Sequence, residues 1–392
     1  MGKIYLDNAT TTRLDPEILV TMLPYLEEEF GSPSSPHSLG RRAREALEVA
    51  RTEVARFAGC QQEEVFFTAS ASEANNLALK GAFGARGRRW RRLLVSAVEH
   101  ASVLHTSQSL AREGADLAVV AVDLQGRVDL DLFAGAARDG AGLVSVMHGN
   151  PEVGTLQPVQ DICRISKECG ALVHIDATAT AGLFPGLWRE LEADLMTLSP
   201  HLFHGPKGIA ALMVRRGIRL LPQIDGGIQE GGLRAGTQSV ALAVGFGEAA
   251  RLAREAAPNR AARLRVLGRR LRDRLEETLS DWVLTGHREA RIPGHLSLCL
   301  KYVEGEAVLG LLDDAGILAG SGSACTLGAG KPSHVLQALG LDPVLARGAV
   351  DFCLSKLNTP EEVDEVGVAL TDIVARLRRL SPLAPGAAEV RS

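Results

Sequence analysis

The sequence predicts an α/β protein: a large domain built on a mostly parallel sheet, followed by a small α+β C-terminal domain. Between about residues 60 and 215, short apolar and β-branched runs alternate with helical patterns. This alternation is typical of a parallel sheet that is covered on both faces. After residue 250 the pattern changes to a long Arg-rich helical stretch, followed by a mixture of strand-like and helical segments. A chain of 392 residues is long enough for two such domains.

The large domain contains six segments that we interpret as short buried strands. Helical patterns lie between them, among them residues 73–82 and 159–169. Sites in such sheets collect at the carboxyl ends of the strands, and both Asp176 and the pair Ser199 and His201 occupy such positions. The six strand-like segments are residues 65–68, 93–96, 117–122, 142–147, 172–176 and 209–214.

The C-terminal part begins with residues 252–279, whose apolar spacing predicts a long helix that links the two domains. Residues 296–300 are strand-like, and residues 305–315 and 360–380 have helical patterns. Strands and helices are therefore expected together in a small α+β unit.

These patterns give the predicted domain boundaries. We assign residues 15–250 to the large domain, and residues 1–14 with 251–381 to the small domain and its linking helix. Residues 382–392 are rich in Pro, Gly and Ala, and we expect a disordered tail there.

The composition is that of a soluble globular protein, with 46% apolar and 23% charged residues. A net charge of −4 gives no basis for a nucleic-acid partner or an anionic membrane surface. No apolar segment approaches the length of a membrane span, and the first residues lack the apolar region of a secretory signal. The six cysteines form no CxxC pair, which argues against a disulfide framework or a zinc site. We therefore expect a cytoplasmic protein.

A series of short motifs follows one order along nearly the whole chain. Together they resemble the cysteine desulfurases of the NifS/IscS type, which are class V aminotransferases that use pyridoxal phosphate (PLP). The resemblance implies PLP fold type I and a homodimer. The motifs are YLDNATT (5–11), GSPSS (31–35), FTASASEANN (67–76), EH (99–100), MH (147–148), HIDA (174–177), SPHLFHGPKG (199–208), RAGT (234–237) and SGSAC (321–325).

One group of residues is expected to bind the cofactor phosphate. Ser70, Ala71 and Ser72 lie at a strand-to-helix turn, where backbone N–H groups and a hydroxyl favour an anion. The resemblance implies two further phosphate donors, Ser199 and His201.

The resemblance also assigns three other cofactor contacts. Asp176 matches the carboxylate that keeps the pyridine nitrogen protonated, so that the cofactor remains an electron sink. His100 matches the imidazole that stacks on the ring. Thr237 matches a residue that reaches the phosphate of the second subunit, which is the reason to expect a homodimer.

The chain departs from the family pattern at the Schiff-base lysine. That position is Leu202, and leucine has no amine with which to form an imine. Lys207 is an alternative imine former, although a lysine at that position belongs to the family pattern without this role.

Three further departures concern the cofactor ring and the substrate. Pro151 and Ala179 replace an Asn and a Gln that contact the ring oxygen in the family. Asp351 replaces the arginine that binds the substrate carboxylate. A carboxylate facing a carboxylate would cost several kcal/mol, so free cysteine is not expected to bind in the family's pose.

Cys325 matches the mobile-loop cysteine that receives sulfur as a persulfide in the family. Its Gly- and Ser-rich surroundings favour an exposed thiol. This thiol is a candidate sulfur acceptor, or one ligand of an iron–sulfur cluster that a partner completes. By contrast, Cys299 and Cys353 have the pattern of buried strand residues.

Three functions remain open at this point. The first is a desulfurase-like protein of iron–sulfur or sulfur-transfer metabolism that has lost PLP chemistry and presents Cys325 to a scaffold or sulfur-acceptor partner. The second is an enzyme that binds PLP non-covalently or through another lysine. The third is a structural or regulatory subunit.

Overall fold

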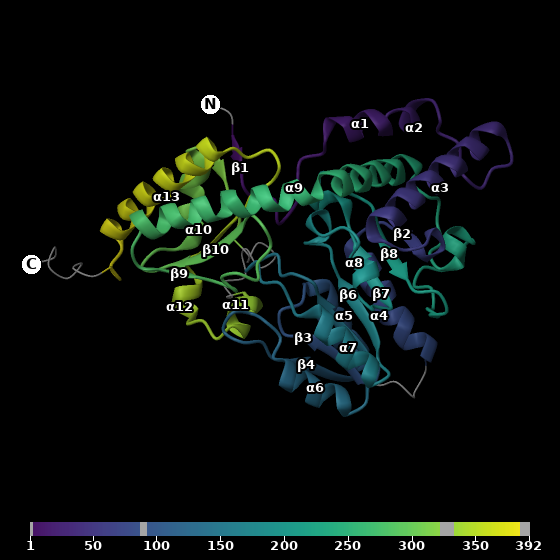
Figure 1. Ribbon diagram of the computed structural model, residues 1–392, viewed down its shortest axis with the longest axis horizontal. Coiled ribbons are helices and arrows are strands. Elements are labelled where there is room, and N and C mark those ends of the chain that lie inside the picture. Colours follow the sequence, from purple (N-terminus) through teal and green to yellow (C-terminus); the bar gives the residue numbers. More distant parts are fainter. Residues whose placement is uncertain (1–2, 87–91, 322–332, 385–392) are drawn as a thin grey trace, which may run out of the picture.

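The computed structural model describes residues 3–86, 92–321 and 333–384. Its centre is a seven-stranded sheet in the order β2-β8-β7-β6-β5-β3-β4 (Figure 1). Strand β8 runs antiparallel to both of its neighbours, and the other described pairings of this sheet are parallel. The mostly parallel sheet predicted from the sequence is thereby confirmed. The strands are β2 (Val65–Thr68), β3 (Arg92–Ser96), β4 (Asp116–Val120), β5 (Ala141–Met147), β6 (Leu172–Asp176), β7 (Leu195–Leu198) and β8 (Ala210–Val214).

Six of these strands coincide with the predicted segments to within two residues at each end. Strand β7 was not among them, because it is only four residues long and carries no β-branched run. Its register pairs Thr197 with Asp176, so Ser199 follows directly beyond the end of the neighbouring strand. The predicted placement of Asp176 and Ser199 at one edge of the sheet is therefore correct.

Helices cover both faces of this sheet. Leu93 and Val95 of β3 pack against α4 and α5 on one face. Val173 and Ile175 of β6 belong to the core on the opposite face, which includes residues of α3 and α7. This alternation follows from the period of two in a strand. The helices are α1 (Pro16–Met22), α2 (Pro24–Glu27), α3 (Ser38–Ala58), α4 (Ala71–Arg86), α5 (Ala101–Arg112), α6 (Leu130–Arg138), α7 (Val159–Glu168) and α8 (Leu187–Glu190).

The linking helix is longer than predicted. Helix α9 spans Val240–Thr278, twelve residues more at its start than the expected helix at 252–279. Gly245 and Gly247 lower helix propensity and obscured this first part. Both glycines allow close packing: a Cβ on Gly247 would lie 2.8 Å from Cα of Ala50, and one on Gly245 would lie 2.6 Å from Sδ of Met22. Figure 1 shows α9 running past both the large and the small sheet.

The C-terminal part contains a three-stranded antiparallel sheet, β12-β10-β9, and the short parallel pair β1 and β11. Helices α10 and α13 and the second half of α9 enclose its apolar core. The strands are β1 (Ile4–Tyr5), β9 (Trp282–Leu284), β10 (His295–Leu300), β11 (Ile317–Leu318) and β12 (Ala349–Cys353). The helices are α10 (Gly305–Asp314), α11 (His334–Ala338), α12 (Pro343–Ala346) and α13 (Pro360–Leu380).

The predicted domain boundary at residue 250 falls inside α9, which continues through it without interruption. The boundaries therefore stay a prediction. The predicted tail lies outside the described residues beyond Ala384. Within the described part of the chain, every helix is too short or too polar to cross a bilayer.

Candidate functional site

The turn before α4 is organised by its own side chains. Ser70 Oγ accepts a hydrogen bond from Glu73 N at 3.1 Å, while Glu73 Oε2 accepts one from Ala69 N at 3.0 Å. Arg234 Nε donates to Glu73 Oε1 at 2.8 Å. Both Ser70 and Ser72 are exposed, and Ala71 is half-buried at the start of the helix. The predicted phosphate turn is thus an accessible helix N-terminus with a carboxylate and a guanidinium beside it.

A chain of hydrogen bonds joins His100 to Asp176. Asn75 Nδ2 donates to Asp176 Oδ2 at 2.8 Å and to Ser102 Oγ at 2.9 Å. Ser102 Oγ lies 2.7 Å from His100 Nδ1, which also accepts from Ser102 N at 3.1 Å. Because Nδ1 accepts from a backbone amide, this network assigns the proton of the neutral ring to Nε2. Two residues predicted separately, His100 and Asp176, are therefore linked through side chains of α4 and α5.

Asp176 itself is buried at the end of β6, and its Oδ1 accepts from Thr178 N at 3.0 Å. The adjacent Glu99 is completely buried, and burial raises the pKa of Glu99 to about 8, helped by the nearby Asp176 carboxylate. Glu99 Oε1 accepts from Met147 N at 2.9 Å. The end of β6 is thus a polar site inside an apolar core.

Ser199 and His201 follow β7 at the same edge of the sheet. Ser199 is buried and its Oγ donates to Ile209 O at 3.4 Å. His201 Nδ1 lies 3.3 Å from Thr11 Oγ1. Burial, followed by the nearby Lys207 charge, lowers the pKa of His201. The hydroxyl and the imidazole that were predicted to bind phosphate are accordingly engaged with neighbouring groups of the chain.

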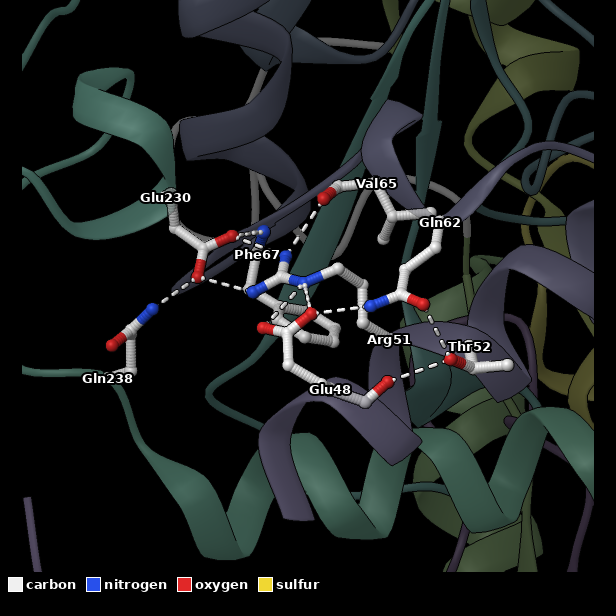
Figure 2. A network of polar contacts seen from close by, with 8 residues as sticks. All are labelled: Glu48, Arg51, Thr52, Gln62, Val65, Phe67, Glu230 and Gln238. Atoms are coloured by element: carbon white, nitrogen blue, oxygen red, sulfur yellow. Dashed lines mark hydrogen bonds and ion pairs between the residues drawn. The ribbon is translucent and has the colours of Figure 1, made fainter. Parts of the chain in front are cut away.

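Thr237 is exposed, and the residue after it, Gln238, belongs to a network around a buried ion pair (Figure 2). Arg51 of α3 binds Glu230 through two bonds, Nη1 to Oε2 at 2.6 Å and Nη2 to Oε1 at 3.0 Å. Glu230 has a left-handed backbone with φ 48° and also accepts from Phe67 N at 2.8 Å. Gln238 donates to Glu230 Oε1 at 2.7 Å. The residue after Thr237 is thereby fixed to the core of the large domain.

Three of the four positions at which the sequence is predicted to depart from the family pattern lie together. Leu202, Pro151 and Ala179 all line one cavity of about 50 Å³ between α9, the loop after β6 and the end of β12. Lys207, the predicted alternative to the missing lysine, is exposed and does not line this cavity. Lys356 does line it, as Leu202 does.

Asp351, the fourth replaced position, lies in β12 and is 4% exposed. Burial, together with the nearby Asp7 and Glu152 carboxyls, raises the pKa of Asp351 well above its usual range. The environment thus favours the neutral acid. The expected repulsion between Asp351 and a substrate carboxylate stays a prediction.

The three cysteines singled out in the sequence differ in their setting. Cys325 lies outside the described residues. Cys299 and Cys353 are buried strand residues as predicted, and Cys353 also lines the cavity beside Leu202. Burial raises the pKa of Cys299 to about 12 and that of Cys353 further still, so both remain thiols. Among the described residues, no group of three or more His, Cys, Asp or Glu side chains is placed to hold a metal ion.

Sequence reasoning missed three polar residues at this site: Asn75, Arg260 and Lys356. Asn75 had a detectable signal, since it stands within a matched motif on the buried face of a helix. Arg260 was hidden in the Arg-rich linking helix. Lys356 follows three other cavity residues, Cys353, Leu354 and Ser355, and this stretch lies far in the sequence from Leu202.

The family model for Aminotransferase class-V matches residues 4–366, and the chain belongs to this family. Among its relatives is a cysteine desulfurase of Gluconacetobacter diazotrophicus, 40% identical over 394 residues that cover 100% of this chain and 98% of the relative. Cysteine desulfurase IscS 1 of Archaeoglobus fulgidus is 41% identical over 97% of this chain and 99% of its own. The solved structure of a NifS-like protein has a TM-score of 0.89 at 35% identity and covers 95% of this chain and 100% of that one. The fold is therefore PLP fold type I, as predicted.

This family is PLP-dependent, and the site fits that cofactor only in part. Asp176 at a strand end, His100 beside it and the accessible turn before α4 have the chemistry to hold a pyridine ring and a phosphate. At Leu202, however, the position predicted for the imine lysine, a hydrocarbon side chain forms part of the cavity wall. The residues present do not fit a cofactor held covalently at this position.

Proposed function

We propose that this protein acts in sulfur transfer or iron–sulfur metabolism without desulfurating cysteine through PLP. The observation that carries the proposal is Leu202 in the wall of the cavity at the family's lysine position. Retention of the fold and of the Asp176 network argues for a chain kept for its shape. We place it in the cytoplasm, where its thiols stay reduced.

Cys325 is the sulfur-carrying group of this proposal. Its thiolate attacks the outer sulfur of a donor persulfide, the donor's S–S bond breaks and the donor leaves as a thiolate. A new S–S bond then holds the sulfur on Cys325 for a scaffold or acceptor protein, and the exchange needs no oxidant. The alternative use of this thiol is as one ligand of an iron–sulfur cluster that the partner completes.

A homodimer is part of this proposal. Large apolar side chains are exposed on α1, after α2 and on the segment before Thr237, including Val20 (66%), Phe30 (70%) and Ile228 (89%). Such groups favour burial in an interface. Sedimentation or light scattering of the purified chain tests it, and a monomer at micromolar concentration would contradict it.

The deciding experiment is a visible absorption spectrum after incubation with PLP and desalting, for the wild type and for Leu202→Lys. We expect no imine band in the wild type and a gain of one in the variant, because only the variant has an amine at position 202, whereas the Lys356 amine is paired with Asp15. Loading of Cys325 is then tested with a low-molecular-weight persulfide donor, by mass spectrometry of the wild type against Cys325→Ser. A wild type that gains no sulfur atom would refute the sulfur-acceptor role.

A second candidate is an enzyme that uses another lysine, and the position of Lys356 in the cavity favours it over Lys207. A stable band in the wild type that is lost in Lys356→Ala and kept in Lys207→Ala would establish it. A purely structural subunit is the remaining alternative, and it requires that Cys325→Ser leave every sulfur or cluster readout unchanged.

A further inference from the structure

The cavity beside Leu202 is small and largely apolar. Leu202, Phe203 and Ile292 contribute to its wall, with further apolar side chains around them. At about 10–15 Å³ for each water, a volume of about 50 Å³ holds roughly three to five water molecules, or one ligand with about four or five non-hydrogen atoms. Only a small molecule fits inside it.

The charge of the cavity wall is positive. None of the described residues that line it is an Asp or a Glu, while Arg260 and Lys356 are both cations. The two histidines in the wall are neutral, because burial lowers the pKa of His204 to about 4 and that of His295 to about 3. Lys356 forms an ion pair with Asp15, which lies outside the wall. One positive charge, that of Arg260, is left without a counter-charge.

Arg260 lacks strong partners among the described residues. Its Nη1 donates to Gly182 O at 3.5 Å, and its Nε is buried without a hydrogen-bond partner. Burial lowers the pKa of Arg260, and the one acid that opposes this effect is Asp15, already engaged by Lys356. An uncompensated, desolvated cation is costly, and an anion bound beside it would remove that cost.

Most other polar groups of the wall are already satisfied. His295 Nδ1 is buried without a partner, but His295 Nε2 donates to Pro151 O at 2.7 Å, so Nδ1 carries a lone pair and offers no donor to an anion. Asn8 Nδ2 donates to Tyr5 O at 3.3 Å and to Cys353 O at 2.7 Å. Thr12 Oγ1 donates to His201 O at 2.8 Å. A multiply charged oxyanion needs donors on several sides, whereas this cavity offers one unpaired guanidinium, because Lys356 already binds Asp15. The match is better to an anion with one charged end and one apolar end.

We propose that this cavity is a binding site for a short aliphatic monocarboxylate, with the carboxylate on Arg260 and the hydrocarbon end against the apolar wall. Charge and shape alone carry this inference, and it does not depend on the function proposed above. It gives the cavity a ligand that needs no amine at position 202.

Propionate is the probe for the test. Saturation-transfer NMR on its methyl group, with the purified full-length protein, should give a saturable signal in the millimolar range that excess acetate displaces. Arg260→Gln should weaken binding by about 10-fold or more, since a hydrogen bond to a charged group is lost. Arg265→Gln is the matched control, because Arg265 is exposed on the same helix and outside the cavity. It should leave binding unchanged.

A second variant removes space and keeps the charge. Ala179→Leu fills the cavity and should also abolish the signal, while circular dichroism verifies that it is folded. If Arg260→Gln does not fold, Ala179→Leu decides alone. Binding that survives Ala179→Leu, or an equal loss in Arg265→Gln, would overturn the site. Displacement by sulfate as effective as that by acetate at matched ionic strength would overturn the assignment to a monocarboxylate.

Discussion

The carboxyl groups of Asp7 and Asp351 meet at Gly320. A Cβ atom on that glycine would lie 2.9 Å from Asp7 Oδ1 and 2.8 Å from Asp351 Oδ2. Gly320 also exchanges two backbone hydrogen bonds with Asp351, N to O at 3.0 Å and O to N at 2.8 Å. Only a residue without a side chain fits there. Two acids from opposite ends of the chain therefore enclose the segment that leads toward Cys325.

This arrangement predicts a pH-dependent stability that Asp351→Asn removes. The pKa of Asp351 is raised in the folded state by burial, Asp7 and Glu152. The folded protein thus binds more protons than the unfolded chain, and its stability falls as pH rises from the unfolded pKa toward the raised folded value. Asp351→Asn lacks that loss, so we expect the variant to gain stability relative to the wild type as pH increases. Urea unfolding at several pH values measures the difference.

The control for this measurement is Asp313→Asn, an exposed acid of the same domain. The free energy of unfolding of the wild type is compared with that of Asp351→Asn at each pH. If the difference is constant with pH, Asp351 is already ionised in the folded protein.

The Arg51–Glu230 pair predicts a large loss of stability in Arg51→Ala. Both side chains are almost fully buried, and the Arg51 guanidinium also lies 4.8 Å from the centre of the Phe67 ring. Removing the arginine leaves a buried carboxylate without its cation, which costs about 3–5 kcal/mol. Chemical denaturation of Arg51→Ala against Arg44→Ala tests this, because Arg44 is exposed on the same helix.

The double variant Arg51→Met with Glu230→Leu should recover part of this loss, since no charge is left buried. The loss in the free energy of unfolding of the double variant is compared with the summed losses of its two single variants. A larger loss in the double variant would show that the pair is not the source of the effect.

Local patterns were sufficient for most elements of the fold. Helix α13 begins and ends at the predicted residues, because Thr359 and Glu362 form a capping box and Pro360 occupies the first turn. Strand β6 was equally clear as an apolar run that ends in an acid. Strand β7 was missed, since its four residues gain their stability from pairing with neighbours on both sides.

The site was predictable only where a motif carried it. His100 and Asp176 were found as separate motif residues, but the side chain that joins them, Asn75, becomes visible only when α4 lies over the sheet. The cavity could not be predicted. Its charged residues, Arg260 and Lys356, come from a long helix and from the loop after β12, and tertiary packing alone brings them together.

Asn75 provides a third prediction. Asn75→Asp places a second carboxyl next to Asp176, so the two acids repel at neutral pH and the variant should be less stable than Asn75→Ala. The penalty should shrink as pH falls, because one of the two carboxyls then takes up a proton. Thermal unfolding at pH 5 and pH 8 follows both variants, with Asn76→Asp as the control on the next residue. Equal stabilities of Asn75→Asp and Asn75→Ala at pH 8 would exclude this contact.

Glu99 provides the fourth prediction, because its charge is opposed by complete burial. The folded pKa of Glu99 is about 8 and its ordinary value is 4.5. The folded state therefore holds the proton more tightly, and stability contributed by the neutral acid is lost as pH rises from about 4.5 through 8. Glu99→Gln mimics the protonated acid and should stay flat over this range. At about 1.4 kcal/mol per pKa unit, the gain over the wild type at pH 9 should reach a few kcal/mol.

Unfolding by urea between pH 5 and pH 9 measures this gain, and Glu113→Gln is the control because Glu113 is exposed. The same titration should alter the Asp176 site, since ionised Glu99 adds a negative charge close to that carboxylate. Nitrogen-15 NMR of the Asn75 side-chain amide, which donates to Asp176, should shift with pH in the wild type and not in Glu99→Gln. A wild-type stability that stays parallel to that of Glu99→Gln from pH 5 to pH 9 would mean that Glu99 does not titrate in this range.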